Sequence, residues 1–211
     1  MHILVIGASR GIGKAVTLAA LEAGHSVRAM SRTADTMDPA QGLEPFAGDA
    51  TRAADLEKAL QGVDAVVMAL GIRETVAMLW KKVTLFSDAT AALVPLMERD
   101  GPSRLICITG IGAGDSAQSL SSVERVGHKI VFSQPYRDKT KQEQIIKESA
   151  LRWTLVRPTV LTNNKASGKY RVLTDPKDWR MGMISRADVA DYVLKALRDD
   201  ETIGTAAVLA R

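Results

Sequence analysis

The stretch that decides the fold is MHILVIGASRGIG, residues 1–13. An apolar run, Ile3–Ile6, ends abruptly at Gly7, and Gly11 and Gly13 follow before an alanine-rich segment with helical spacing. This order predicts a strand, a tight turn and the N-terminus of a helix, the context that a dinucleotide-binding glycine motif requires. Glycines remove the Cβ atoms that would block a pyrophosphate, and the N–H groups at a helix N-terminus attract its negative charge. We therefore expect a cofactor-binding loop here; a purely structural turn is the alternative.

Short apolar runs alternate with helical patterns along almost the whole chain. Apolar strands separated by helices are typical of a parallel sheet with helices on both faces, and right-handed crossovers then give a doubly wound, Rossmann-type α/β fold. We expect a single NAD(P)-binding Rossmann domain over residues 1–211, with a small C-terminal substrate region. The expected strands cover residues 2–6, 26–31, 44–47, 64–69, 104–109, 152–157 and 205–209, the last closing the sheet, and the expected helices cover 12–23, 52–61, 75–99, 138–149 and 186–198.

Two segments, residues 110–135 and residues 162–183, show no clear hydrophobic period of a helix or a strand. Ligands of doubly wound sheets bind beyond the carboxyl ends of the strands, where the winding reverses, and both segments would emerge at that edge. Long irregular segments inside a compact domain are usually functional or mobile. We expect the two segments to wall a substrate pocket; plain surface excursions are the alternative.

The composition excludes several classes of protein. Of the 211 residues, 46% are hydrophobic and 25% are charged, which is ordinary for a globular protein. The net charge of +4 comes from scattered Lys and Arg, with three each of Trp, Tyr and Phe, so neither a basic stripe nor an aromatic platform for nucleic acid is visible. No apolar run approaches the roughly 20 residues of a membrane helix. A cleavable signal peptide would destroy the glycine motif, so we expect a cytoplasmic protein.

Cysteine and metal chemistry are not indicated. The single cysteine, Cys107, lies in the apolar run 105–108, which predicts a buried strand residue rather than a reactive thiol. One cysteine also excludes an internal disulfide. No spacing of His, Cys and Asp predicts a metal site.

The end of the second strand selects the form of the cofactor. A carboxylate there normally accepts hydrogen bonds from the adenosine ribose of NAD, but residues 27–32 read VRAMSR and contain no acid. Ser31 and Arg32 are expected to hold a 2′-phosphate instead, Arg32 through its planar donor fork. Arg10, within the glycine loop, is placed to approach the same phosphate. The sequence therefore favours NADP(H) over NAD(H).

Two further strand ends are candidates for cofactor contacts. Asp49 follows the third strand and is suited to accept a hydrogen bond from the adenine amino group, with Ala50 packing nearby. The alternative is that Asp49 caps the helix that starts near Arg52. Backbone of the segment after the fourth strand is expected to approach the cofactor's ribose and phosphates, through Ala69, Leu70 and Gly71.

Five motifs together resemble one superfamily. They are GASRGIG at 7–13, GDA at 48–50, DKxxQE at 138–143, WTLVRPT at 153–159 and ISRADVA at 184–190. The chain resembles the short-chain dehydrogenase/reductase superfamily, specifically its atypical NmrA-like, NAD(P)H-binding branch, over nearly its whole length. That branch includes flavin and biliverdin reductase-like proteins, quinone reductase-like proteins, and members that bind cofactor without catalysis.

The resemblance implies roles for particular residues. Lys139 matches the lysine that reaches the nicotinamide ribose, and we expect Lys139 and Thr109 to orient the cofactor for catalysis. Asp138, Gln142 and Glu143 match a pattern in which the acids fix the lysine and its helix; a solvated helix face is the alternative. The diphosphate and adenosine end is expected at Gly7, Ser9, Arg10, Gly11, Ile12 and Gly13, and the nicotinamide end at the backbone of Pro158, Thr159 and Val160.

Departures from the superfamily pattern reduce the number of reactions that the site is expected to catalyse. The superfamily pairs a Tyr with a Lys four residues later, but the residue four before Lys139 is Pro135, and Tyr136 is one position off. The expected Ser after the fifth strand is Gly110, with Thr109 before it. The glycine loop also has the spacing of the superfamily's carbonyl reductases rather than the GATGxxG of many atypical members. Ordinary alcohol dehydrogenation is therefore disfavoured.

A reaction that mainly needs hydride geometry remains open. Reduction of a small conjugated acceptor, such as a flavin or quinone, fits because the acceptor itself delocalises the arriving charge. The alternative is a non-catalytic NADP(H)-binding redox sensor that acts through a protein partner. A sugar-nucleotide epimerase-like enzyme is a third option, but it needs the missing tyrosine.

The remaining candidates are weaker. Ser116, Tyr136 and His128 are possible donors in a substrate pocket, and Trp80 and Trp179 are possible stacking partners for a planar acceptor, with core or rim packing the alternative. The long predicted helices leave a homodimer possible.

Overall fold

The computed structural model describes residues 1–72, 83–119 and 133–211. The candidates Trp80 and His128, and the first part of the helix expected from residue 75, lie outside these ranges.

The described residues form an eight-stranded sheet with the order β3-β2-β1-β4-β5-β6-β10-β8. Neighbouring strands run parallel except at the edge, where β8 is antiparallel to β10. The order reverses between β1 and β4, which places the ligand-binding edge of the sheet beyond the carboxyl ends of these strands. The strands are β1 (His2–Ile6), β2 (Ser26–Ser31), β3 (Leu43–Ala47), β4 (Ala65–Met68), β5 (Arg104–Ile108), β6 (Arg152–Pro158), β8 (Arg171–Leu173) and β10 (Thr205–Ala210).

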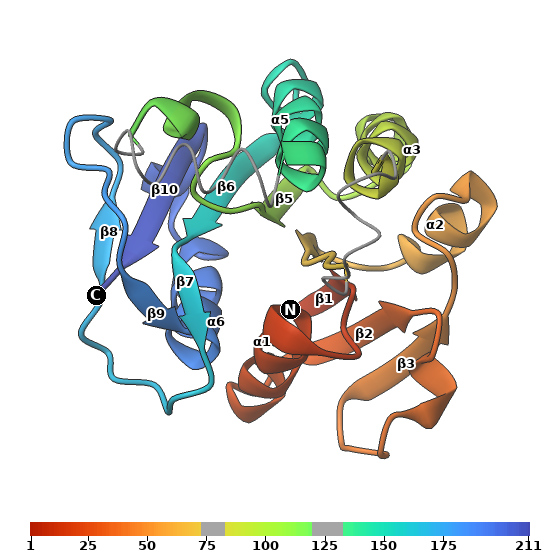
Figure 1. Cartoon of the computed structure of the whole chain (residues 1–211). Helices are drawn as coiled ribbons and strands as arrows, with labels where there is room; N and C mark the ends of the chain where they lie inside the picture. Colours follow the sequence, from red (N-terminus) through yellow and green to blue (C-terminus); the bar gives the residue numbers. More distant parts are fainter. Residues whose placement is uncertain (73–82, 120–132) are drawn as a thin grey trace.

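Helices cover both faces of the sheet (Figure 1). Helices α1 (Gly11–Glu22) and α6 (Arg186–Ala196) pack together on one face. Helix α3 (Leu85–Asp100) packs on the other face between α2 (Ala53–Ala59) and α5 (Ser133–Lys147). This arrangement confirms the predicted doubly wound α/β fold.

Each face of the sheet has its own hydrophobic core. On β1, Ile3 and Val5 pack towards α1 and α6, whereas Leu4 and Ile6 pack towards α2, α3 and α5. Successive side chains of a strand point to opposite faces. A strand buried on both faces therefore reads as a continuous apolar run, which is why periodicity located these strands correctly.

The C-terminal third of the chain differs from expectation. Residues 162–183 contain the short strand β8, which pairs outside β10, so the prediction that the strand at 205–209 closes the sheet is wrong. A second, two-stranded parallel sheet joins β7 (Val160–Thr162) to β9 (Met183–Ser185). These strands have three residues each, which is too short for a period-2 pattern to be recognised.

Helix α5 begins at Ser133, five residues before its predicted start at Asp138. Pro135 lies in its first turn, where a missing N–H is tolerated because such groups have no partner within the helix. Because a proline often marks a helix boundary, the sequence pattern placed the start of α5 after Pro135 and missed its first turn. Over the described ranges, none of the helices is long and apolar enough to cross a membrane.

Candidate functional site

The glycine loop between β1 and α1 requires its glycines for steric reasons. A Cβ atom on Gly7 would lie 2.6 Å from the Ala69 carbonyl oxygen, and one on Gly13 would lie 2.1 Å from the Gly7 carbonyl oxygen. Gly7 thus lets the loop pass against the end of β4, and Gly13 lets α1 pack against the loop. At Gly11, where φ is +59°, a Cβ would meet no described atom within 4 Å. The loop is therefore closed towards the sheet and open at Gly11, which fits the close approach of a pyrophosphate.

The other residues predicted at this loop lie around it. Ser9 and Ile12 are half-buried, and Arg10 is exposed. The Arg10 Nη2 atom donates a hydrogen bond to the Gly71 carbonyl oxygen over 3.3 Å. This bond links the glycine loop to the segment after β4, so the two predicted backbone contacts with a cofactor lie side by side.

The end of β2 carries no carboxylate and an exposed Arg32. Ser31 Oγ accepts a hydrogen bond from the Thr33 N–H over 3.3 Å. Arg32 acts electrostatically on Asp49, at the end of β3: hydrogen bonds from Thr51 lower the pKa of Asp49 below its usual range, and the charges of Arg32 and Arg52 add to the effect. Arg32 therefore lies on the β3 side of the loop, whereas Arg10 lies on the β4 side.

Asp49 does not cap helix α2. Its Oδ1 atom accepts hydrogen bonds from the N–H (2.9 Å) and hydroxyl (2.8 Å) of Thr51, while the residue at the cap position is Arg52. The capping alternative is thus wrong, and the carboxylate stabilises the turn that precedes the helix. Ala50 is buried against the core between the sheet and α2.

Lys139 and Thr109 meet at the end of β5. The Lys139 Nζ atom, on α5, donates a hydrogen bond to the Thr109 carbonyl oxygen. The same ammonium lies 5.0 Å from the centre of the Phe86 ring and 5.9 Å from that of Tyr136. Burial lowers the pKa of Lys139 to about 8, although the charge of Glu143 acts in the opposite direction. The lysine predicted to be functional is therefore held in one place, in a site that weakens its charged form.

Asp138 is a structural residue rather than a solvated one. It is 3% exposed, and its Oδ2 atom accepts a hydrogen bond from the Phe86 N–H over 2.8 Å. The Ser87 hydroxyl donates to its other oxygen. A carboxylate at this place satisfies N–H groups at the start of α3 and interacts favourably with the helix dipole. Asp138 thereby fixes the Phe86 ring against which Lys139 lies.

The rest of this helix face is also buried, so the solvated-face alternative is wrong for it. Gln142 is 1% exposed and donates to Thr90 Oγ1 over 3.0 Å. Glu143 is equally buried and accepts a hydrogen bond from the Thr109 hydroxyl over 2.7 Å. The DKxxQE pattern thus describes one face of α5 packed onto α3 and β5.

Sequence reasoning missed a buried arginine, Arg157, on β6. Its guanidinium bonds to both oxygens of Glu143, through Nε over 3.0 Å and Nη2 over 2.6 Å. Nη2 also donates to Asp115, and the Trp179 ring lies 4.9 Å from Cζ. The signal was present in WTLVRPT, because a charged residue within an otherwise apolar strand requires a buried partner.

Two weaker candidates are not available as pocket groups. Ser116 is fully buried, where its hydroxyl donates to Ala113 O and accepts from Gly112 N. Trp179 is 7% exposed, lies on Arg157, and donates from Nε1 to the Leu173 carbonyl. The core-packing alternative is therefore the correct one for Trp179, and Ser116 stabilises the turn after β5.

Gly110 lies close to Tyr136, so a side chain at this position would press on the tyrosine. A Cβ atom on Gly110 would lie 3.2 Å from the Tyr136 hydroxyl oxygen. Tyr136, three residues before Lys139, thus directs its hydroxyl to the backbone at the end of β5. The two departures from the superfamily pattern, at Gly110 and Tyr136, therefore lie next to each other in the structure.

The segment after β6 combines fixed backbone with an exposed apolar side chain. Thr159 N–H and Oγ1 both donate to the Leu209 carbonyl, over 3.1 and 3.0 Å, which ties this segment to β10. Pro158 is buried, but Val160 is 52% exposed. Its register partner on β9, Met183, is 62% exposed. The predicted nicotinamide end of the site is therefore rigid in its backbone and apolar at its surface.

The ISRADVA motif has a structural role. Ser185 accepts a hydrogen bond from the Asp188 N–H at the start of α6, and Asp188 in turn accepts bonds from Ser185, Ser167 and Gly168. Burial alone would raise the pKa of Asp188, but these hydrogen bonds outweigh it and hold the pKa below its usual range. The motif anchors the segment before β8 to α6.

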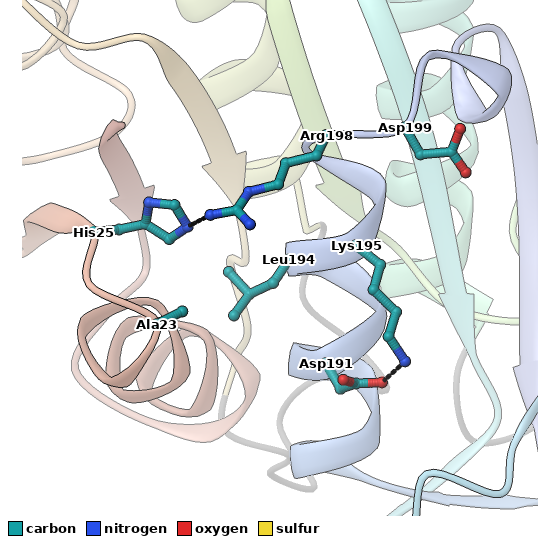
Figure 2. A pocket seen from close by; sticks show the side chains of 7 residues that line it. All are labelled: Ala23, His25, Asp191, Leu194, Lys195, Arg198 and Asp199. Atoms are coloured by element: carbon teal, nitrogen blue, oxygen red, sulfur yellow. Dashed lines mark hydrogen bonds and ion pairs between the residues drawn. The ribbon is translucent and has the colours of Figure 1, made fainter.

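One pocket lies at the opposite edge of the sheet, between the end of α1 and α6 (Figure 2). It is lined by Ala23, His25, Asp191, Leu194, Lys195, Arg198 and Asp199. Figure 2 shows Arg198 reaching the His25 ring, 2.8 Å from Nε2, and Lys195 pairing with Asp191 over 2.6 Å. Since His25 immediately precedes β2, this pocket is at the amino ends of the strands and is separate from the glycine loop.

Comparisons with known proteins identify the family of the chain and show which structures share its fold. A family model described as NAD(P)H-binding matches residues 7–200. A protein of Bacillus subtilis (strain 168), named uncharacterized sugar epimerase YhfK, is 27% identical over 96% of this chain and 90% of its own length. The structure of ChuY, described as an anaerobilin reductase from Escherichia coli O157:H7, has a TM-score of 0.82 at 24% identity, covering 100% of this chain and 97% of ChuY.

A short-chain dehydrogenase/reductase from Veillonella parvula DSM 2008, solved in complex with NADP, has a TM-score of 0.84 at 17% identity. The alignment covers 100% of this chain and 94% of that one. These structures show a shared fold, and the family model covers almost the whole chain, including the glycine loop, α5 and β6. The protein is therefore a member of the NAD(P)H-binding family.

Proposed function

We propose that the protein is an NADPH-dependent oxidoreductase that reduces a small conjugated acceptor, such as a flavin or quinone. The observation that supports this most directly is the Lys139 ammonium held on the Thr109 carbonyl at the end of β5. This places one cation beyond the sheet edge on which the glycine loop opens. The bound cofactor supplies the hydride, and the chain's own residues bind and orient it.

The cofactor site follows the carboxyl edge of the sheet. The glycine loop binds the pyrophosphate, the end of β3 binds the adenine, and Lys139 binds the nicotinamide ribose. Thr109 orients Lys139, and the fixed backbone after β6 supports the nicotinamide. The proposed contacts are Gly7, Ser9, Arg10, Gly11, Ile12, Gly13, Ser31, Arg32, Asp49, Ala50, Ala69, Leu70, Gly71, Thr109, Lys139, Pro158, Thr159 and Val160.

The preference for NADPH rests on charge at the end of β2. Arg32 is exposed there without a neighbouring carboxylate on the strand, and Ser31 contributes a hydroxyl. An NAD-specific carboxylate would repel a 2′-phosphate, whereas an arginine binds it through two parallel hydrogen bonds. Arg10 contributes from the other side of the glycine loop.

The acceptor is proposed to be conjugated because the site does not reproduce the superfamily's proton relay. Gly110 replaces the serine, and the tyrosine is displaced by one position. An acceptor that delocalises negative charge takes its proton from water. The exposed Val160 and Met183 offer an apolar surface next to the proposed nicotinamide end. The likeness to ChuY adds anaerobilin to the acceptors that deserve a trial.

The test is NADPH oxidation by the purified protein, with FMN, FAD, simple quinones and anaerobilin offered in turn. Oxidation that depends on one acceptor and falls at least about tenfold in Lys139→Ala supports the proposal. Equal oxidation by wild type and Lys139→Ala contradicts the assigned site.

A second candidate, a redox sensor that binds NADP(H) without turnover, is favoured by the same missing relay. It predicts tight NADPH binding, no oxidation with any acceptor, and a protein partner whose affinity depends on the bound nucleotide. Calorimetry with NADPH and NADP, followed by partner capture in the presence of each, separates the two candidates.

A further inference from the structure

Glu143 and Arg157 are buried opposite charges at the junction of β5, α5 and β6. Their side chains are 1% and 0% exposed. The planar guanidinium meets the carboxylate through two hydrogen bonds, the bidentate geometry that gives such pairs their directionality. Burial alone would lower the pKa of Arg157, but the bonds and charge of Glu143, with those of Asp115, outweigh it and keep the pKa above its usual value.

Stability alone does not explain this pair. Replacing a buried ion pair by apolar residues of similar volume is often neutral or stabilising, since removing both charges from water costs about as much as their attraction returns. Neither side chain is exposed enough to touch a ligand. The pair's effect is therefore geometric, and the atoms it contacts show what it positions.

Those contacts converge on Thr109. Lys139 and Glu143 are four residues apart on α5 and so share one helix face. Lys139 donates to the Thr109 carbonyl, while the Thr109 hydroxyl donates to Glu143 Oε1 over 2.7 Å. The same Glu143 oxygen accepts the Arg157 Nε bond. Thr109 is thus held at its main chain by one residue of α5 and at its side chain by the other.

The turn after β5 closes directly over the pair. Gly114 has φ +55°, and a Cβ atom there would lie 2.3 Å from Glu143 Oε2 and 3.0 Å from Arg157 Nη2. Asp115, the next residue, accepts a bond from Arg157 Nη2 and pairs with Lys147 of α5. The pair therefore also fixes the turn that begins at Thr109.

We propose that Glu143 and Arg157 are positioning residues that fix Thr109, and through its carbonyl the Lys139 ammonium, at the carboxyl end of β5. The consequence for catalysis rests on the proposed function, in which Lys139 orients the nicotinamide ribose. The groups that face Lys139 are Cys107 of β5, Glu143 of α5 and the rings of Phe86 and Tyr136.

The first test is Thr109→Val, which breaks the link to Glu143 without changing any charge. We expect kcat for NADPH oxidation to fall by about tenfold, since small displacements of an orienting group reduce rates strongly. KM for NADPH should change less than about threefold, because the glycine loop is untouched. Thr109→Ser restores the hydroxyl and should recover most of the lost kcat.

The second test reads Lys139 directly and needs no acceptor. Lysines are reductively methylated with ¹³C, and the Lys139 signal, assigned by its loss in Lys139→Arg, is titrated by NMR. Glu143→Gln removes the nearby negative charge and should lower the pKa of Lys139. Glu148→Gln, the same change at an exposed position of the following turn, should leave the titration unchanged.

These measurements separate the two proposals. If no acceptor is reduced, the proposed function fails while the NMR titration still tests the positioning. A folded Thr109→Val protein with wild-type kcat, or a Lys139 titration that Glu143→Gln does not move, overturns the positioning role. Circular dichroism of each variant checks that it is folded. If Glu143→Gln does not fold, Thr109→Val still tests the proposal, because it leaves the charges of Glu143 and Arg157 paired.

Discussion

The two halves of the carboxyl edge of the sheet are built differently. At β1 and α1 the site is made of backbone: glycines whose missing Cβ atoms let the loop, β4 and α1 approach within contact distance. At β5, α5 and β6 the site is made of side chains, a buried network of Thr109, Lys139, Glu143 and Arg157. The comparison teaches that the first half can be recognised from glycines within seven positions of one another, whereas the second combines side chains up to 48 positions apart.

In the backbone half, adding one Cβ atom to a glycine should strongly lower the stability of the fold. Gly13→Ala places a Cβ within 2.1 Å of the Gly7 carbonyl oxygen and should lower the free energy of unfolding by about 3 kcal/mol, the upper range for overpacking. Urea denaturation measures this change. Gly71→Ala is the matched control, since its Cβ would meet no described atom within 4 Å, and its effect should stay within about 0.5 kcal/mol. Equal effects of the two changes would refute the steric account.

Removing positive charge from the same half should weaken its preference for NADPH over NADH without unfolding the protein. The double variant Arg10→Ala, Arg32→Ala should weaken NADPH binding by about tenfold or more relative to NADH, because charge-assisted bonds to a phosphate are lost. Isothermal titration with both nucleotides measures the ratio. Arg52→Ala, an exposed arginine that also acts on Asp49, is the control. An unchanged ratio in the double variant means that a 2′-phosphate is not bound there.

Substitutions in the side-chain half should lower the rate of turnover. Lys139→Ala should lower kcat, or the affinity at the nicotinamide end, by about tenfold, equivalent to about 1.4 kcal/mol. Steady-state kinetics with the best acceptor, together with NADPH titration, separates the two effects. Lys141→Ala, on the exposed side of the same helix, is the control. If Lys139→Ala and Lys141→Ala behave alike, the lysine held at Thr109 has no role in the reaction.

The last expected effect is a pH dependence of stability. Burial lowers the pKa of Lys139 from 10.5 to about 8. Between these values the unfolded chain binds the proton and the folded chain does not, so the contribution of Lys139 to the free energy of unfolding rises with pH. Lys139→Met should remove this rise. Denaturation of both proteins across that pH range measures the difference, and a difference independent of pH contradicts the shifted pKa.

The sequence predicted the long elements well because their signals are local. Strands β1, β2, β5 and β6 bury apolar side chains on both faces, and each begins and ends within two residues of its predicted range. The three-residue strands β7, β8 and β9 were missed, since their pairing is decided by partners elsewhere in the chain. The first turn of α5 was missed because Pro135 resembles a helix boundary.

The same division applies to the site. Gly7, Gly11 and Gly13 were identified from their spacing between a strand and a helix, and they lie in the loop after β1 and the first turn of α1, where that spacing placed them. Lys139 was identified through resemblance, but its partner Thr109 is thirty residues away, and only the fold shows that they touch. Asp49 was left between two roles, and the structure excludes the cap because Thr51 takes the carboxylate.

The sequence by itself determined the order of the long strands and helices, the glycine loop and, by resemblance, the family of the protein. The long elements and the loop follow from sterics and hydrophobic periodicity within a few neighbouring residues, whereas the family follows from the resemblance of five motifs between residues 7 and 190. Only the tertiary structure decided that Arg157 pairs with Glu143, that Asp138 holds the start of α3, and that β8 forms the edge of the sheet. The physical reason is that a buried charge or the edge of a strand requires a partner, and this requirement can be recognised in the sequence. Which distant residue becomes the partner is decided only by the packing of the folded chain.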